Sequence, residues 1–168
     1  YLVNKLLMQK IVAFDTETEG LDSLETEIVG ISFSWLEKKG FYVPIENSES
    51  LQKEYFEIMR PFFENKEITK VGHNLKFEIK VLFKYNIEVS GPLYDTMVAH
   101  YLINPDMRHN LDTLSESYLN YSPISIESLI GKRGKNQGSM RDVSIEKLTD
   151  YAAEDADLTL QLKQIFDE

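Results

Sequence analysis

The sequence contains no cysteine among its 168 residues. Disulfide bonds, thiolate zinc sites and cysteine nucleophiles are therefore all excluded. The chain also lacks an apolar run long enough to span a bilayer, and it shows no signal-peptide pattern. Together these absences fit a protein of the reducing cytoplasm, which is the location that we expect.

Basic residues are scarce, with 18 Lys and Arg against 28 Asp and Glu, and the formal net charge is −10. Such a charge disfavours a surface that contacts phosphates broadly. A nucleic-acid partner would depend instead on metal ions and on a few local Lys and Arg side chains. Residues 131–141 form the one concentrated basic segment of the sequence.

The length and the composition suit one globular domain. The hydrophobic content is 42%, enough for a sizeable core, and no repeat, low-complexity tract or linker divides residues 1–168. The chain begins at Tyr1 rather than Met, which suggests a piece of a longer protein. We therefore expect one domain over 1–168.

The residue patterns predict alternating strands and helices. Strands are expected at 11–14, 27–35, 41–45, 68–72 and 93–95. Helices are expected at 50–60, 74–85, 96–103, 110–119, 126–130 and from 144 to the C-terminus. The order predicts an α/β fold with a mixed five-stranded sheet and helices on its faces.

The stretch FDTETEGLD (14–22) places two carboxylates at the end of the first expected strand. Asp15 and Glu17 are two positions apart, so their side chains point to the same face. Adjacent like charges repel, and a divalent cation is the usual reason for an enzyme to keep them together. A solvated strand end is the alternative that this motif alone leaves open.

Two further acidic motifs follow, each on an expected helix. In VGHNLKFEIKVL (71–82), Asn74 and Glu78 share a helical face near the helix N-terminus, although this motif alone is more simply explained as a capped amphipathic helix. In YAAEDADLTLQL (151–162), Tyr151 and Asp155 share a face with alanines between them. The alternative for this last motif is a solvated acidic helix.

Together, the three motifs resemble those of the four-carboxylate (DEDD) family of 3′–5′ exonucleases, Tyr subclass. The match is strongest with the proofreading exonuclease domains of the bacterial DNA polymerase I family (family A), and it covers nearly the whole chain. Asp95-Thr96-Met97 and the Gly-Lys-Asn-Gln stretch at 134–137 are similar too. The resemblance implies a ribonuclease H-like fold whose active site lies beside a central first strand.

The resemblance further implies two divalent ions, Mg²⁺ or Mn²⁺, held by Asp15, Glu17, Glu78 and Asp155. Asp15 is expected to bridge the ions, and Tyr151 to orient the attacking water. The family has Asp where this chain has Glu78, which puts the affinity for the second ion in question. The implied activity is removal of nucleoside 5′-monophosphates from a single-stranded or frayed DNA 3′ end, beside a polymerase domain in the same full-length chain.

Substrate contacts are expected from a smaller set of residues. Leu21 matches the family residue that wedges against terminal bases. Such an apolar wedge helps to separate a frayed 3′ end, since single-stranded bases are recognised by stacking. The other expected contacts are Asn74, Lys76, Arg108 and Ile126. The basic side chains Lys132, Arg133, Lys135 and Arg141 contact the nucleic-acid backbone or are merely solvated.

Two other functions compete with proofreading. A catalytically weakened or vestigial exonuclease domain would serve as a structural or DNA-binding module of the polymerase, and Glu78 is the residue that supports this alternative. An RNA-processing exonuclease of the same fold is the second. The three histidines are expected to be structural or peripheral.

Overall fold

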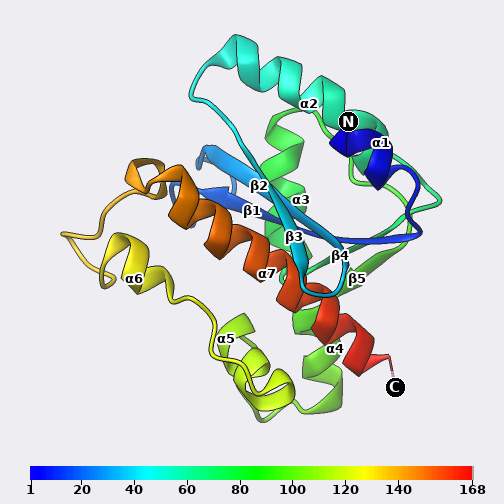
Figure 1. The fold of residues 1–168 in the computed structure, drawn as a ribbon, viewed down its shortest axis with the longest axis vertical. Helices are drawn as coiled ribbons and strands as arrows, with labels where there is room; N and C mark the ends of the chain where they lie inside the picture. Colours follow the sequence, from blue (N-terminus) through cyan, green and yellow to red (C-terminus); the bar gives the residue numbers. More distant parts are fainter. Residues whose placement is uncertain (168) are drawn as a thin grey trace.

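The computed structural model describes residues 1–167, which form an α/β fold around a central five-stranded sheet (Figure 1). The strands are β1 (Ile11–Thr18), β2 (Ile28–Leu36), β3 (Lys39–Pro44), β4 (Thr69–Gly72) and β5 (Leu93–Asp95). Their order in the sheet is β3-β2-β1-β4-β5. β1 pairs antiparallel with β2 and parallel with β4, so the expected mixed sheet with a central first strand is confirmed.

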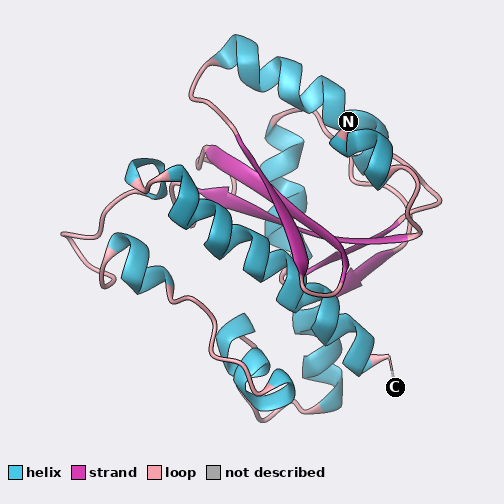
Figure 2. Cartoon of the chain, viewed as in Figure 1, coloured by secondary structure: helices cyan, strands magenta, loops and turns pink. Residues whose placement is uncertain are grey.

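Helices cover both faces of this sheet (Figure 2). The α-helices are α1 (Leu2–Leu6), α2 (Glu49–Phe63), α3 (Leu75–Lys84), α4 (Thr96–Ile103), α5 (Leu111–Leu114), α6 (Ile126–Ile130) and α7 (Ile145–Phe166). A π-helical turn, η1 (Ser115–Leu119), continues α5, and a 3₁₀ turn, η2 (Met140–Asp142), precedes α7. Among the described residues, no helix is both long and apolar enough to cross a membrane.

The main core lies between one face of the sheet and the helices α2 and α3. Phe14 of β1 packs edge-to-face on Phe63 of α2, with ring centroids 5.2 Å apart. Phe33 of β2 packs in the same way on Phe62, at 5.6 Å. These four rings are fully buried, and their burial on this face requires Asp15 and Glu17 to point to the other.

Helix α7 crosses that other face and contacts β1, β2, β3 and β4 (Figure 1). Small residues let the helix approach the strands closely. Ala152 and Ala156 are fully buried, and a Cβ atom at Gly40 of β3 would lie 2.1 Å from the Ala153 carbonyl oxygen. The fold therefore brings the middle of α7 against the strand that carries Asp15.

Some expected boundaries were wrong. β1 runs to Thr18, so both carboxylates lie within the strand rather than just after it. Helix α2 begins at Glu49 after Ser48, and it continues through Pro61 to Phe63. The segment expected as one helix over 110–119 is an α-turn followed by a π-turn, and neither α1 nor η2 was expected.

Candidate active site

Three carboxylates meet between β1 and α7. Asp15 and Glu17 project from β1 on the face opposite Phe14, and Asp155 projects toward them from α7. One carboxylate oxygen from each residue lies within 4.8 Å of the others. Asp155 lies 140 positions after Asp15 in the sequence, and the packing of α7 on the sheet brings the two together.

Burial and mutual repulsion make this cluster hard to ionise. Burial raises the pKa of Asp15 from 3.8 to about 7. Burial first, and then the negative charges of Asp15 and Asp155, raise the pKa of Glu17 well above its usual range. The pKa of Asp155 is raised by burial and by Asp15, while a hydrogen bond from the Tyr151 hydroxyl lowers it.

This donor set fits a divalent cation. Glu17 is only 6% exposed, and one of its carboxylate oxygens, Oε1, is buried without a hydrogen-bond partner. A buried acceptor without a partner is costly, and a bound cation would satisfy it. Carboxylate oxygens are the ligands that Mg²⁺ and Mn²⁺ prefer, so the cluster suits a hard metal ion.

Glu78 lies beside this cluster but on the other side of β1. It is 4% exposed, and its Oε2 accepts a hydrogen bond from the Thr16 amide at 3.1 Å and a second from the Thr16 hydroxyl. Thr16 points away from Asp15 and Glu17 because successive side chains alternate across a strand. Glu78 is therefore outside the group of three, although its charge contributes to the raised pKa of Glu17.

An open cleft of about 550 Å³ leads to the three carboxylates. Tyr151 lines it beside Asp155, and so do two of the expected substrate contacts, Leu21 and Ile126. Leu21 is 77% exposed, so it does not pack in the core. The structure thus brings these two residues to the same cleft as the carboxylates.

The other three expected substrate contacts are not among the described residues that line the cleft. Asn74 adopts a left-handed backbone conformation with φ of 72°, and its amide donates to Asp95 Oδ1 at 3.1 Å. Lys76 and Arg108 are exposed side chains. Contact between any of these residues and a substrate stays a prediction.

Several cleft residues were missed or assigned elsewhere. His73, expected to be structural or peripheral, lines the cleft, and its Nδ1 lies 2.8 Å from the Thr96 hydroxyl. Burial lowers the pKa of His73 to about 4, so the ring is neutral near pH 7. Phe77 and Leu111 also line the cleft, and the position of His73 and Phe77 beside Asn74 and Glu78 was the signal available in the sequence.

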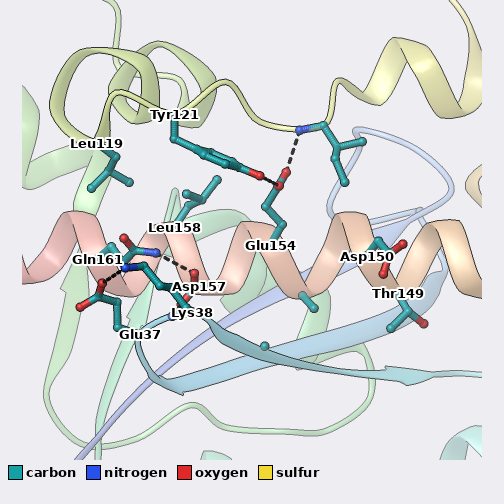
Figure 3. A pocket seen from close by; sticks show the side chains of 13 residues that line it. Glu37, Lys38, Leu119, Tyr121, Thr149, Asp150, Glu154, Asp157, Leu158 and Gln161 are labelled. Atoms are coloured by element: carbon teal, nitrogen blue, oxygen red, sulfur yellow. Dashed lines mark hydrogen bonds and ion pairs between the residues drawn. The ribbon is translucent and has the colours of Figure 1, made fainter.

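A second hollow, of about 690 Å³, lies on another side of α7 and has acidic walls (Figure 3). Two of its carboxylates, Glu154 and Asp157, already accept hydrogen bonds within the protein. Glu154 accepts from the Tyr121 hydroxyl at 2.5 Å and from the Ile124 amide at 2.7 Å. Asp157 accepts from the Lys38 amide at 2.7 Å. These bonds attach the segment after η1 and the β2–β3 turn to α7, so we assign this hollow a structural role.

Comparison with known proteins agrees with this geometry. Residues 1–168 match the profile of a family described as 3′–5′ exonuclease. The chain is 36% identical over 171 residues to DNA polymerase I of Pseudomonas aeruginosa, and 37% identical over 169 residues to that of Borreliella burgdorferi. These matches cover 96% and 98% of the chain but only 19% and 18% of the relatives, so the chain spans about a fifth of their length.

Solved structures share the fold at lower sequence identity. Escherichia coli RNase D, an exoribonuclease involved in structured RNA processing, has a TM-score of 0.73 at 18% identity, over 99% of this chain and 41% of that one. Brucella melitensis NrnC with bound Mg²⁺ has a TM-score of 0.70 at 21% identity, over 95% and 73% of the two chains. The fold is thus the ribonuclease H-like α/β fold that the motifs predicted.

Proposed function

The chain belongs to the 3′–5′ exonuclease domain family of DNA polymerase I, and from this premise we propose that it edits DNA 3′ ends for a polymerase in the same full-length protein. The reaction is hydrolysis of the terminal phosphodiester, which releases a nucleoside 5′-monophosphate. The DNA end enters the cleft as a single strand or a frayed terminus. Two divalent ions, Mg²⁺ or Mn²⁺, are the proposed cofactors.

The carboxylates of Asp15, Glu17 and Asp155 hold the metal site in this proposal, with Glu78 contributing from across β1. When bound, the metal ions supply an activated water and stabilise the negative charge that develops on the leaving 3′-oxygen. Asp15 would be the central ligand of that site. Its position supports this role, since the Asp15 charge raises the pKa of Glu17, Glu78 and Asp155 alike.

Tyr151 is proposed to orient the attacking water. Burial and the neighbouring carboxylates raise the pKa of its phenol far above the ordinary value, so the hydroxyl keeps its proton at any physiological pH. A protonated phenol both donates and accepts hydrogen bonds, which suits it to holding a water molecule between Asp155 and the phosphate. Its contribution is therefore orientation rather than proton transfer.

Leu21 and Ile126 are proposed to hold the terminal bases. Both are apolar residues that line the same cleft as the carboxylates. Apolar contact with unstacked bases is independent of sequence, as an editing enzyme requires, because every base has a face that can pack against a side chain. A terminal mismatch frays more readily than a matched pair, so this arrangement favours its removal.

One observation carries the proposal: the convergence, within 4.8 Å, of oxygens from three carboxylates that line an open cleft. The hydrogen bonds from Thr16 to Glu78 favour a second candidate, a domain whose metal affinity is weakened. Such a domain would act chiefly as a structural or DNA-binding module of the polymerase.

The test is digestion of a 5′-labelled single-stranded DNA oligonucleotide in Mg²⁺ and, separately, in Mn²⁺. Asp15→Ala and an EDTA control remove the metal site, and Asp106→Ala is a matched control at an exposed loop aspartate. An RNA oligonucleotide of the same sequence tests the sugar preference. A DNA duplex with a matched or a mismatched 3′ end tests editing.

The proposal predicts a descending ladder with the wild type and Asp106→Ala, none with Asp15→Ala, and faster removal of the mismatched end. Folded wild-type protein that gives no ladder in either metal would support the weakened module instead. A clear preference for RNA would move the substrate to the class that RNase D represents.

A further inference from the structure

Arg141 occupies the end of the long basic loop, in the 3₁₀ turn η2 just before α7. Its guanidinium does not project into solvent like the other basic side chains of the loop. Instead, Nη1 donates to the Ile45 carbonyl oxygen at 3.3 Å and Nη2 donates to the Ile28 carbonyl oxygen at 3.2 Å. The third donor, Nε, forms an ion pair with Glu19.

These three partners come from three separate segments of the protein. Glu19 begins the turn after β1, two residues beyond Glu17 and two before Leu21. Ile28 is the first residue of β2, and Ile45 directly follows β3. A planar guanidinium has five donors in a fixed fork, so it can satisfy several acceptors at once, which Lys cannot do with the same geometry.

One of the segments that Arg141 joins, the turn at Glu19, lines the cleft together with Gly20 and Leu21. Several residues between Ile126 and Met140, in the segment that ends at Arg141, line the same cleft. Met140, the neighbour of Arg141, is 3% exposed and packs with Val29 of β2. The Arg141 side chain is thus a bridge between the turn that carries Leu21 and the end of the basic loop.

We propose that Arg141 is a positioning residue that sets the width of the cleft and the place of Leu21, and so controls how well the DNA 3′ end binds. This inference rests on the proposed exonuclease function. Arg141 acts through Glu19 and the strand ends rather than by touching the substrate, since each of its three side-chain nitrogens already donates to a partner within the protein. The exposed Lys132, Arg133 and Lys135 are the loop residues free to meet phosphates.

The experiment compares three variants with the wild type on a single-stranded DNA oligonucleotide in Mn²⁺. Arg141→Gln removes the charge and the fork, whereas Arg141→Lys keeps the charge and removes the fork. Arg60→Gln is the matched control, because Arg60 of α2 likewise pairs with carboxylates and donates to a backbone carbonyl, at the far side of the sheet from α7.

We expect both Arg141 variants to raise KM roughly tenfold or more, because small displacements of a binding group have large effects, while kcat stays within about twofold. The control should leave both constants unchanged. The dependence of KM on salt should keep the wild-type slope in Arg141→Gln, whereas loss of a direct phosphate contact would lower that slope by about one.

A second measurement does not depend on activity. Trypsin cleavage at Lys132, Arg133 and Lys135 reports how firmly the loop is held at its end, and we expect Arg141→Gln to be cut several-fold faster than Arg60→Gln. Should Arg141→Gln fail to fold, Glu19→Gln removes the ion pair alone, and the same rise in KM is expected.

The proposal is overturned if Arg141→Lys behaves as wild type, if the salt slope falls in Arg141→Gln, or if KM and the trypsin rate are unchanged. A wild type that degrades no nucleic acid would refute the proposed function, and the trypsin measurement would still test the bridge. The two failures are therefore distinguishable.

Discussion

Without metal, the cluster of Asp15, Glu17 and Asp155 should make folding less favourable as the pH rises. The pKa of Asp15 is raised from 3.8 to about 7, so between these values the folded state binds a proton that the unfolded state has released. Its stabilising contribution is complete below the unfolded value and is lost as the pH rises through about 7. Glu17 and Asp155, whose pKa values are also raised, act with the same sign.

The size of the effect follows from the shift. A rise from 3.8 to about 7 corresponds to about 4 kcal/mol, and screening at the open cleft reduces this to about 2 kcal/mol for Asp15. For a chain of this length, about 2 kcal/mol changes Tm by roughly 4–8 °C. Asp15→Asn removes the charge with little change in shape, and it also relieves Glu17 and Asp155 of a repulsive neighbour.

The assay is thermal unfolding in EDTA at pH 5 and pH 8. We expect the wild-type Tm to fall between the two pH values, and Asp15→Asn to exceed the wild type by roughly 4–8 °C at pH 8 and by much less at pH 5. Excess Mn²⁺ at pH 8 should raise the Tm of the wild type and have little effect on Asp15→Asn. Asp106→Asn, at an exposed loop position, is the control for loss of one negative charge.

The reasoning is refuted by a wild-type Tm that does not fall with pH in EDTA, or by an Asp15→Asn variant less stable than the wild type at pH 8. Either result would mean that the carboxylates are not crowded in the metal-free protein. A variant that is more stable but still degrades DNA would instead contradict the proposed role of Asp15 in catalysis.

Three further predictions concern single side chains. Tyr151→Phe should lower kcat roughly a hundredfold with little change in KM, measured by steady-state kinetics, because it removes only the hydroxyl that bonds Asp155. Glu78→Gln should keep an acceptor for the neighbouring strand yet raise the Mn²⁺ concentration needed for half-maximal rate by roughly tenfold or more, and an unchanged metal titration would exclude a role in metal binding. Burial lowers the pKa of Lys70 to about 8, so this residue should make the protein more stable as the pH rises from 8 toward 10. In thermal unfolding, Lys70→Met should lose that gain in stability, whereas Lys53→Met, at an exposed site, should keep it.

The sheet could be predicted from the sequence because its strands carry strong local signals. All five strands were expected, within a few residues of their observed bounds. They are the first strand, the next two β-rich runs and the short strands before α3 and α4. The shortest elements could not. Helix α1 (Leu2–Leu6) has only one buried residue, Leu6, and η2 is a three-residue turn that depends on Ser139 and on the contacts of Arg141.

The helix expected over 110–119 shows a different limit. Its apolar spacing suits a helix, but the segment changes from α to π at Ser115, whose hydroxyl is buried without a hydrogen-bond partner. His100 of α4 is fully buried against this turn, with its Nε2 3.1 Å from the Tyr118 hydroxyl. Contacts between distant segments thus determine the local geometry, and such contacts have no signature in a short stretch of sequence.

Local patterns in the sequence also predicted part of the candidate site, but they did not predict the position of Glu78. Strand alternation alone predicted that Asp15 and Glu17 share a face, and the small residues around Asp155 predicted its close approach. Glu78 follows a different strand and reaches β1 from the opposite side, where the Thr16 amide and hydroxyl compete with any metal ion for its carboxylate. Glu has one methylene more than Asp, which lengthens its reach. Only the packing of α3 on the sheet could decide where this carboxylate lies.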